Sequence, residues 1–219
     1  MTTMTTRDKL LDAASRALAE DGVAGVSART VAARAEVNQA LVFYHFGSVS
    51  GLLEAAVRRS VDVAVATYRD RFADVSSLPE LLAVGRGLHE AEKRAGSVQQ
   101  MAQVMAGASQ DEALSAAGRY AMERWSAEIE VVLSRVLRPT PVHGLVDPHG
   151  LARTVAAGFI GLELYDEVDP DAAGSAFDAL DAIGALVSAL DGLPPLAVRA
   201  LRSRARRAVT RAAARASAP

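Results

Sequence analysis

The stretch Ser27–Phe46, with the sequence SARTVAARAEVNQALVFYHF, decides how this chain folds. Alanine and valine recur at helical spacing over residues 28–35, which predicts a helix with Ser27 as its N-cap. The polar break Glu36-Val37-Asn38 ends this helix, and Asn38 can cap a second helix that runs to about Tyr44. The stretch therefore predicts two helices joined by a three-residue turn.

The second of these helices is too short to be stable by itself. At about 1.5 Å of rise per residue, Asn38–Tyr44 is only about 10 Å long, and a helix of that length is marginal in water. Neighbouring apolar side chains must hold it, and the candidates are Val31, Ala32, Val37, Val42 and Phe46. Such a helix-turn-helix presents the start of a rigid helix to the major groove of DNA.

The side chains on this motif suit DNA. The amides of Asn38 and Gln39 can bond base edges, with adenine as the natural partner, and Leu41 can touch a thymine methyl. Polar groups at both ends of the motif can donate to phosphate oxygens. The expected DNA-binding residues are Arg29, Thr30, Asn38, Gln39, Ala40, Leu41, Tyr44 and His45. Phe43 and Phe46 are expected in the core instead.

Residues Arg29–Leu53, which end in FYHFGSVSGLL, resemble the DNA-binding domain of the TetR family of bacterial transcriptional regulators. The preceding stretch LLDAASRALAEDG is similar to the opening of that domain, so the resemblance covers roughly residues 7–60. It implies a homodimer on a palindromic operator in double-stranded DNA, with recognition helices about one DNA turn (~34 Å) apart. It also implies a small-molecule effector site in the larger part of the chain, and a repressor whose operator binding is relieved by a small apolar ligand.

Two positions depart from the family pattern. Glu36 stands in the turn where the family usually has glycine, and a left-handed non-glycine residue there costs about 1 kcal/mol. Val49-Ser50 replaces a common Lys-Glu pair, which removes one charged contact with phosphate. These changes bear on affinity and sequence preference more than on fold.

The rest of the chain also predicts helices, so we expect an all-α protein. Beside 28–35 and Asn38–Tyr44, the expected helices are 7–20, 51–72, one from Pro79 that breaks at Gly96, 97–107, 111–137, 148–167, 170–191 and 194–215. In this scheme Asp21-Gly22 ends the first helix and Ser50 caps the helix from Gly51. We expect a helix-turn-helix domain over residues 1–53, which continues into the linking helix 51–72, and a ligand-sensing and dimerisation domain over residues 54–219.

Two sets of residues in the larger domain follow from the resemblance. The four-helix bundle typical of the family, formed with the helices of a second copy, implies a dimer interface with Gly158, Leu162, Phe177, Leu180, Gly184 and Val187. The ligand pocket would draw on His89, Met101, Met105, Trp125, Phe159 and Tyr165. For both sets, packing inside one subunit is the open alternative.

The composition and residue pattern argue against several classes of protein, including disulfide-bonded proteins, membrane proteins and enzymes. Cysteine is absent, which excludes disulfides and thiolate metal sites, and the formal net charge is −2. No stretch reaches the ~20 apolar residues of a membrane span, and the opening residues lack an apolar signal core, so we expect a cytoplasmic protein that associates with the nucleoid when bound to DNA. No paired carboxylates stand beside a nucleophile, and His143, Asp147 and His149 fit no defined metal spacing. We therefore expect no enzyme activity, no cofactor and no metal.

Charge is distributed unevenly along the sequence. Residues 193–219 hold seven arginines and no acidic residue, whereas Glu163–Asp181 holds seven acidic residues and no basic one. The arginine-rich helix can dock with its charges in water, pair with the acidic stretch, or touch DNA non-specifically. At the level of the whole protein, a ligand-independent DNA-binding regulator or an accessory DNA-binding protein stays open beside the ligand-relieved repressor.

Overall fold

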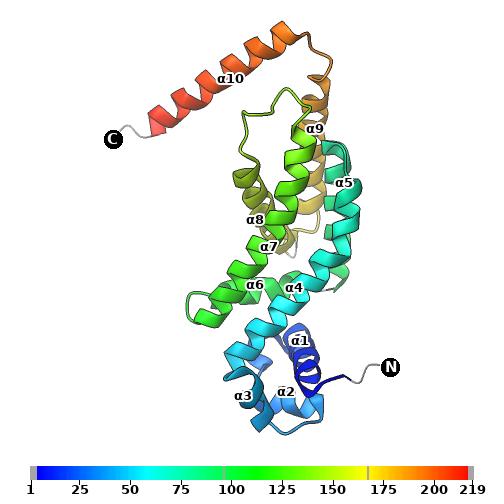
Figure 1. The fold of residues 1–219 in the computed structure, drawn as a ribbon, viewed down its shortest axis with the longest axis vertical. Helices are drawn as coiled ribbons and strands as arrows, with labels where there is room; N and C mark the ends of the chain where they lie inside the picture. The colour runs from blue at the N-terminus through cyan, green and yellow to red at the C-terminus, as the bar shows by residue number, and fades with distance from the viewer. Residues whose placement is uncertain (1–3, 96, 167, 217–219) are drawn as a thin grey trace.

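The protein is built from helices. This computed structural model describes residues 4–95, 97–166 and 168–216, and the regular structure in those ranges is helical apart from one isolated bridge between His143 and Val146. The helices are α1 (Thr6–Gly25), α2 (Ala28–Ala35), α3 (Ala40–Phe46), α4 (Val49–Asp74), α5 (Leu78–Ala95), α6 (Ser97–Gly107), α7 (Glu112–Leu137), α8 (Pro148–Asp166), α9 (Ala172–Ala189) and α10 (Pro195–Ala216). Helices α1 to α3 form a small head at one end of the long axis (Figure 1). The all-α prediction is confirmed.

Local capping explains where the helices of the head begin. Ser27 accepts a hydrogen bond from the backbone N–H of Thr30, and the Thr30 hydroxyl accepts one from the Ser27 N–H, which together form a capping box. Ser48 caps α4 by accepting from the Gly51 N–H at 2.9 Å. The expectation that Ser50 caps this helix was wrong, because α4 begins at Val49 and already contains Ser50.

Helix α1 extends further than the sequence predicted. A turn at Asp21-Gly22 was expected to end it, and Gly22 does leave the helical conformation, with φ 69° and ψ −176°. Glycine adopts these angles without a Cβ clash, and a further short helical segment then runs to Gly25. The predicted left-handed conformation of Glu36 is confirmed, with φ 55° and ψ 45°.

The head and the larger domain share one apolar core. Leu10 and Val31 from the head and Leu52 from the start of α4 are fully buried in the same cluster as Val104 of α6 and Leu114 of α7. Helix α4 leaves the head and runs beside α7 in the larger domain (Figure 1). The expected domain boundary between residues 53 and 54 therefore lies within a continuous apolar core, to which residues on both sides contribute.

A second core fills the larger domain. Its buried members come from α4, the α4–α5 turn, α5, α7 and α8, and they are Tyr68, Phe72, Val75, Leu88, Ile129, Val132, Leu133, Val136, Leu137, Ala152 and Ala156. The Arg135 side chain donates to the backbone carbonyls of Phe72 and Val75 where α4 ends. This contact anchors the end of α4 against α7.

Helix α9 is apolar and largely uncovered in the isolated chain. Its mean hydropathy of 1.2 over 18 residues satisfies the length and composition of a membrane span, although only 22% of it is buried. One such helix is weak evidence for a membrane, because helices that pack in soluble bundles have the same composition. The helix begins at Ala172, so Pro170 lies before it and not inside it as the sequence suggested.

Helix α10 lies at the end of the long axis opposite the head and reaches away from the bundle (Figure 1). Arg202 holds it by donating to the backbone carbonyls of Pro141 at 2.8 Å and Thr140 at 3.4 Å. The exposed side chains beyond this anchor include Arg204, Arg206, Arg207 and Arg211.

Candidate nucleic-acid interface

The outward face of α3 is the candidate surface for DNA. Gln39, Ala40, Phe43 and Tyr44 are exposed and lie at i, i+1, i+4 and i+5, which places them on one side of the helix. Tyr44 is 81% exposed and Phe43 is 51% exposed. The expectation that Phe43 belongs to the core was wrong, since Val42 is the residue of α3 that turns fully inward. Its i+4 spacing from Gln39 was the signal that could have placed Phe43 on this face.

Backbone hydrogen bonds in the turn fix the direction of α3. The Glu36 N–H donates to the Ala33 carbonyl at 3.2 Å, and the Val37 N–H donates to the Ala32 carbonyl at 3.0 Å. The Asn38 side-chain oxygen then accepts from the Ala40 N–H at 2.8 Å. Asn38 thus caps the start of α3, as the sequence suggested, and its side-chain NH₂ is left to reach a base edge.

The other predicted contact residues differ in how available they are. Arg29 is exposed near the start of α2, whereas the Thr30 hydroxyl already donates to the Gly25 carbonyl at 2.9 Å. Leu41 is half-buried against the core of the head. His45 is half-buried between the rings of Tyr44 and Phe46, with centroid distances of 5.0 and 6.2 Å. The structure brings all eight residues to the same part of the head, and they are not equally free to bind.

The head carries no net charge with which to attract phosphate. Residues 1–50 contain five basic and five acidic residues. One of the arginines, Arg34, is bound to Glu20 and, at 2.5 Å, to Asp21, and these carboxylates raise the pKa of its guanidinium. Recognition by this face must therefore depend on short-range hydrogen bonds and helix orientation more than on bulk attraction.

Two polar contacts join the head to the larger domain. The Ser50 hydroxyl, on the first turn of α4, donates to Asp111 at 2.5 Å, while Asp111 caps α7 by accepting from the Ala113 N–H at 2.8 Å. The hydrogen bond from Ser50 is the main cause that lowers the pKa of Asp111. The Val23 N–H at the end of α1 donates to the side chain of Gln103 on α6 at 2.7 Å. These contacts tie the first turn of α4 and the end of α1 to α7 and α6.

A buried polar cluster connects α5 with α8. His89 is 3% exposed and its Nδ1 lies 2.6 Å from the Glu163 carboxylate, while Nε2 lies 3.8 Å from Asp166. Burial raises the pKa of Glu163. A hydrogen bond from Lys93 lowers the pKa of Asp166. The cluster therefore holds two carboxyl groups with opposite pKa shifts, raised for Glu163 and lowered for Asp166.

The six candidate pocket residues do not surround one space. His89, Trp125 and Phe159 border the second core, and the rings of His89 and Phe159 are 6.5 Å apart. Met101 packs against the first core, where it is shared with the head, and Met105 approaches Gly118 of α7. Tyr165 is 56% exposed on α8. His89 and Phe159 are thus close to each other, Trp125 packs against both cores with its ring 6.2 Å from that of Tyr68, and the other three residues lie elsewhere.

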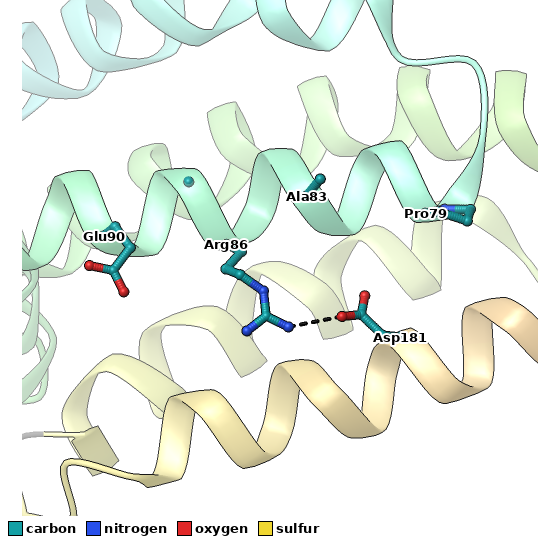
Figure 2. A pocket seen from close by; sticks show the side chains of 6 residues that line it. Pro79, Ala83, Arg86, Glu90 and Asp181 are labelled. Atoms are coloured by element: carbon teal, nitrogen blue, oxygen red, sulfur yellow. Dashed lines mark hydrogen bonds and ion pairs between the residues drawn. The ribbon is translucent and has the colours of Figure 1, made fainter.

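A surface groove lies between α5 and α9, away from that core. It has a volume of about 340 Å³ and is lined by Pro79, Ala83, Arg86, Gly87, Glu90 and Asp181. Arg86 bridges it by donating to Asp181 at 2.8 Å (Figure 2). None of the predicted pocket residues lines this groove or a second hollow of about 200 Å³ near Pro148.

The candidate dimer residues divide into inward and outward sets. Phe177 is 5% exposed against His89 and Arg86 of the same chain, and a Cβ on Gly184 would lie 3.2 Å from Leu82. These two residues pack α9 on α5, which is why they are not available to a partner. The outward set on α8 and α9 comprises Gly158, Leu162, Leu180 and Val187 together with Val155, Tyr165, Ile183 and Leu186, all exposed or half-buried.

Comparison with known proteins finds relatives of the head among bacterial transcriptional regulators. Residues 10–56 match the family described as bacterial regulatory proteins, tetR family. The HTH-type transcriptional regulator BetI of Burkholderia thailandensis is 40% identical over 68 residues, which are 31% of this chain and 35% of that protein. BetI of Burkholderia cenocepacia shows the same identity and coverage. The chain thus spans about a third of the length of the curated relatives it matches.

The fold as a whole is similar to solved structures. A TetR-family transcriptional regulator from Rhodococcus sp. superimposes with a TM-score of 0.68 at 24% identity, over 82% of this chain and 98% of that one. The multidrug binding protein EbrR, in complex with proflavin, gives a TM-score of 0.56 at 24% identity over 80% of this chain and 99% of that one. These likenesses concern the fold, while the sequence match lies in the head. Residues 10–56 therefore place the head of this chain in the TetR family of bacterial regulatory proteins, and the larger domain shares the fold of solved structures from that family.

Proposed function

We propose that this protein is a sequence-specific DNA-binding regulator whose α3 reads the major groove of an operator. The observation that carries the proposal is the exposed face of Gln39, Ala40, Phe43 and Tyr44 on a short helix held in a fixed direction by the turn. Gln39 is suited to a base edge, Phe43 to a thymine methyl and Tyr44 to a phosphate oxygen. The proposal places the protein in the cytoplasm, on the nucleoid when it is bound to DNA.

The proposal includes a homodimer. Leu180, Ile183 and Leu186 are 42%, 56% and 69% exposed on α9, and Val155 and Tyr165 add apolar surface on α8. A contiguous apolar surface of this kind is typical of an interface. Gly158 and Gly161 on α8 have open space around them, which lets a second helix approach closely. Two-fold symmetry would then present two copies of α3 to two half-sites of a palindrome.

The proposal also includes repression relieved by a small ligand. We place the ligand at the border of the second core, near His89, Trp125 and Phe159, because aromatic rings and one buried polar pair meet there. The likeness in fold to the multidrug binding protein EbrR in its complex with proflavin supports an apolar, planar class of ligand. Such a ligand would favour a position of α7 and α6 that alters the direction of both heads, through the contacts of Asp111 and Gln103.

Selection of bound duplexes from a random pool tests the DNA-binding part. The expected result is a palindromic consensus, with half-sites about one helical turn apart. Gln39→Ala should weaken binding by about 1–3 kcal/mol and relax the preference at one base pair in each half-site. Gln110→Ala is the matched control, because Gln110 is also exposed but lies in the turn between α6 and α7. Equal enrichment of all sequences would contradict the proposal.

Relief of DNA binding by a ligand is tested by a separate measurement. The selected duplex is titrated with a panel of planar aromatic compounds, and loss of binding at a defined concentration is expected for some of them. Trp125→Ala should shift that concentration without changing the affinity for DNA when no compound is present. If no compound changes DNA affinity, the protein regulates without a ligand, and only this part of the proposal fails. A reporter gene behind the selected sequence distinguishes repression from activation.

A further inference from the structure

Helix α10 differs from the rest of the molecule in charge. It carries seven arginines and no acidic residue, whereas residues 1–50 have a formal charge of zero and residues 51–192 a formal charge of −9. Of these three segments α10 is therefore the positive one. A polyanion that approaches the protein is repelled by the middle segment and attracted by α10.

The arginines of α10 whose side chains are described are not neutralised by the protein itself. Elsewhere in the described structure six arginines form ion pairs with carboxylates, namely Arg34, Arg58, Arg59, Arg69, Arg86 and Arg124. On α10, within the part whose side chains are described, no arginine lies within 4.0 Å of a carboxylate. Arg202 binds backbone carbonyls, and Arg204, Arg206, Arg207 and Arg211 are exposed. These four charges are available to a partner.

The chemistry of the helix favours nucleic acid over a membrane or the acidic surface of a second copy. Amphipathic helices that lie in membranes use bulky Trp, Phe and Leu, but from Ser203 onward the apolar residues of α10 are alanine and one valine. The exposed carboxylates of α9, Asp178 and Asp181, already bind Arg86 of their own chain. Duplex DNA, in contrast, offers one unpaired negative charge per about 1.7 Å of its axis.

We propose that α10 is a second, sequence-independent nucleic-acid-binding element that holds the phosphate backbone of a duplex segment other than the one read by α3. The head and α10 lie at opposite ends of the long axis (Figure 1), so one straight duplex does not touch both. The protein would therefore bridge two DNA segments. The bridge rests on the proposed function of the head, whereas the attraction of α10 for phosphate does not.

Salt dependence tests the contact with phosphate. A variant with Arg204→Gln, Arg206→Gln, Arg207→Gln and Arg211→Gln keeps residues that favour helices and removes four charges. The matched control carries Arg71→Gln, Arg94→Gln, Arg119→Gln and Arg138→Gln, which removes four exposed charges from α4, α5 and the region of α7. Binding of the full chain to a mixed-sequence duplex is measured by fluorescence anisotropy over a range of salt concentrations. The slope of log K against log salt should fall in magnitude by about 3 in the α10 variant and by less than about 1 in the control.

Co-capture tests the bridge. A duplex selected by the head is immobilised, and a labelled mixed-sequence duplex is added with the protein. The wild type should retain the label, while the α10 variant should bind the immobilised duplex and lose the label. An unchanged salt slope overturns the proposal, and so does binding of the wild type to phosphatidylserine vesicles through α10 with no binding to duplexes. A reduced slope without co-capture overturns the bridge.

The same measurements separate this inference from the function of the head. In a variant with Asn38→Ala and Gln39→Ala, the α10-dependent part of the salt slope should persist while the sequence preference disappears. If the wild type selects no sequence but its slope still depends on the four arginines, sequence reading by the head fails and phosphate binding by α10 stands.

Discussion

Glu36 shows that one residue can lower the stability of a turn, through an unfavourable backbone conformation, without changing the fold. It occupies a left-handed conformation with φ 55°, in which its Cβ is disfavoured, and its backbone N–H still completes the turn by bonding Ala33. The neighbouring Asn38 tolerates its position because its side chain caps α3. The turn is therefore maintained by hydrogen bonds and by packing, in spite of an unfavourable residue.

Replacing that residue should stabilise the protein. Glu36→Gly is expected to raise the free energy of unfolding by about 1 kcal/mol, because glycine adopts the left-handed conformation without a Cβ clash. For a chain of this size the midpoint of thermal unfolding should rise by about 2–4 °C. Ala33→Gly, on the exposed side of α2, is the control and should lower the midpoint instead. A lower midpoint for Glu36→Gly would show that its side chain makes a contact worth more than the strain.

The buried Glu163 should make stability depend on pH. Burial raises its pKa in the folded state above the ordinary value of 4.5. The unfolded chain therefore releases this proton first as pH rises, and stability should decrease from about pH 4.5 through the raised pKa. Glu163→Gln is expected to remove this part of the pH dependence while it keeps the contact with His89.

Thermal unfolding across that pH range checks this expectation. Glu130→Gln is the matched control, because Glu130 makes the same kind of contact with His149, at 2.8 Å, in an exposed position. The control should follow the wild-type pH profile. An identical profile for Glu163→Gln would mean that the ionisation of Glu163 does not contribute.

At the scale of helices, the sequence pattern predicted where each helix lies better than it predicted the residues at which the helix begins and ends. Helices 28–35 and 97–107 were predicted with the observed bounds, because Ser27 caps the start of the first and the polar turn after Ala35 ends it, while Ser97 and Gly107 bound the second. Gly22 interrupts α1 where the sequence predicted a stop, and what the sequence missed is the short helical segment that follows it to Gly25. Phe43 was misplaced because an aromatic residue in a short amphipathic helix resembles core, and only the packing of Val42 decides which side faces inward.

The start of α7 is where helix capping and domain coupling meet. Asp111→Ala should lower the free energy of unfolding by about 1 kcal/mol, because it removes the cap of α7 as well as the acceptor for Ser50. Asp111→Asn keeps a capping oxygen and should cost less. Chemical denaturation at neutral pH compares the two variants. Equal losses would show that the carboxylate charge, and not the cap, is what matters.

The pKa of Asp111 adds a second check. It is lowered in the folded state, so the stabilisation by the charged carboxylate is present above about pH 3.8 and lost as pH falls through the folded value. Between these limits the stability of the wild type should fall toward that of Asp111→Asn. A constant difference between the two proteins would exclude this contribution.

At the scale of the whole molecule, the uncovered surface of α8 and α9 sets the expected assembly. Ile183→Glu places a charge in the middle of the proposed interface and should convert a dimer into monomers. Operator affinity should then fall by at least tenfold, since each monomer binds only one half-site. Val131→Glu, at an equally exposed valine on α7, is the control and should remain dimeric. Sedimentation velocity measures both, and a dimeric Ile183→Glu variant would locate the interface elsewhere.

Sequence alone could predict the head but not the inner arrangement of the larger domain. The motif around α2 and α3 is local, so residue spacing was enough to identify its two helices and most of its outward face, with Phe43 as the exception. Phe177 and Gly184, in contrast, differ from Leu180 and Ile183 only in which neighbour they meet, and that depends on the long-range packing of α5 on α9. For the same reason Met101 could not be assigned to the first core instead of the second.

The apolar core that spans the head and the larger domain limits how such a protein can be recombined. The interior beneath α1 and α4 is completed by side chains of α6 and α7, namely Val104, Leu114, Ala117 and Ala121. A head transplanted onto the larger domain of another protein would therefore lose part of its apolar core. Chimeras should succeed only when α6 and the first half of α7 travel with the head. Under the proposed function, specificity for an operator and responsiveness to a signal would therefore be inherited together, because both depend on this one core.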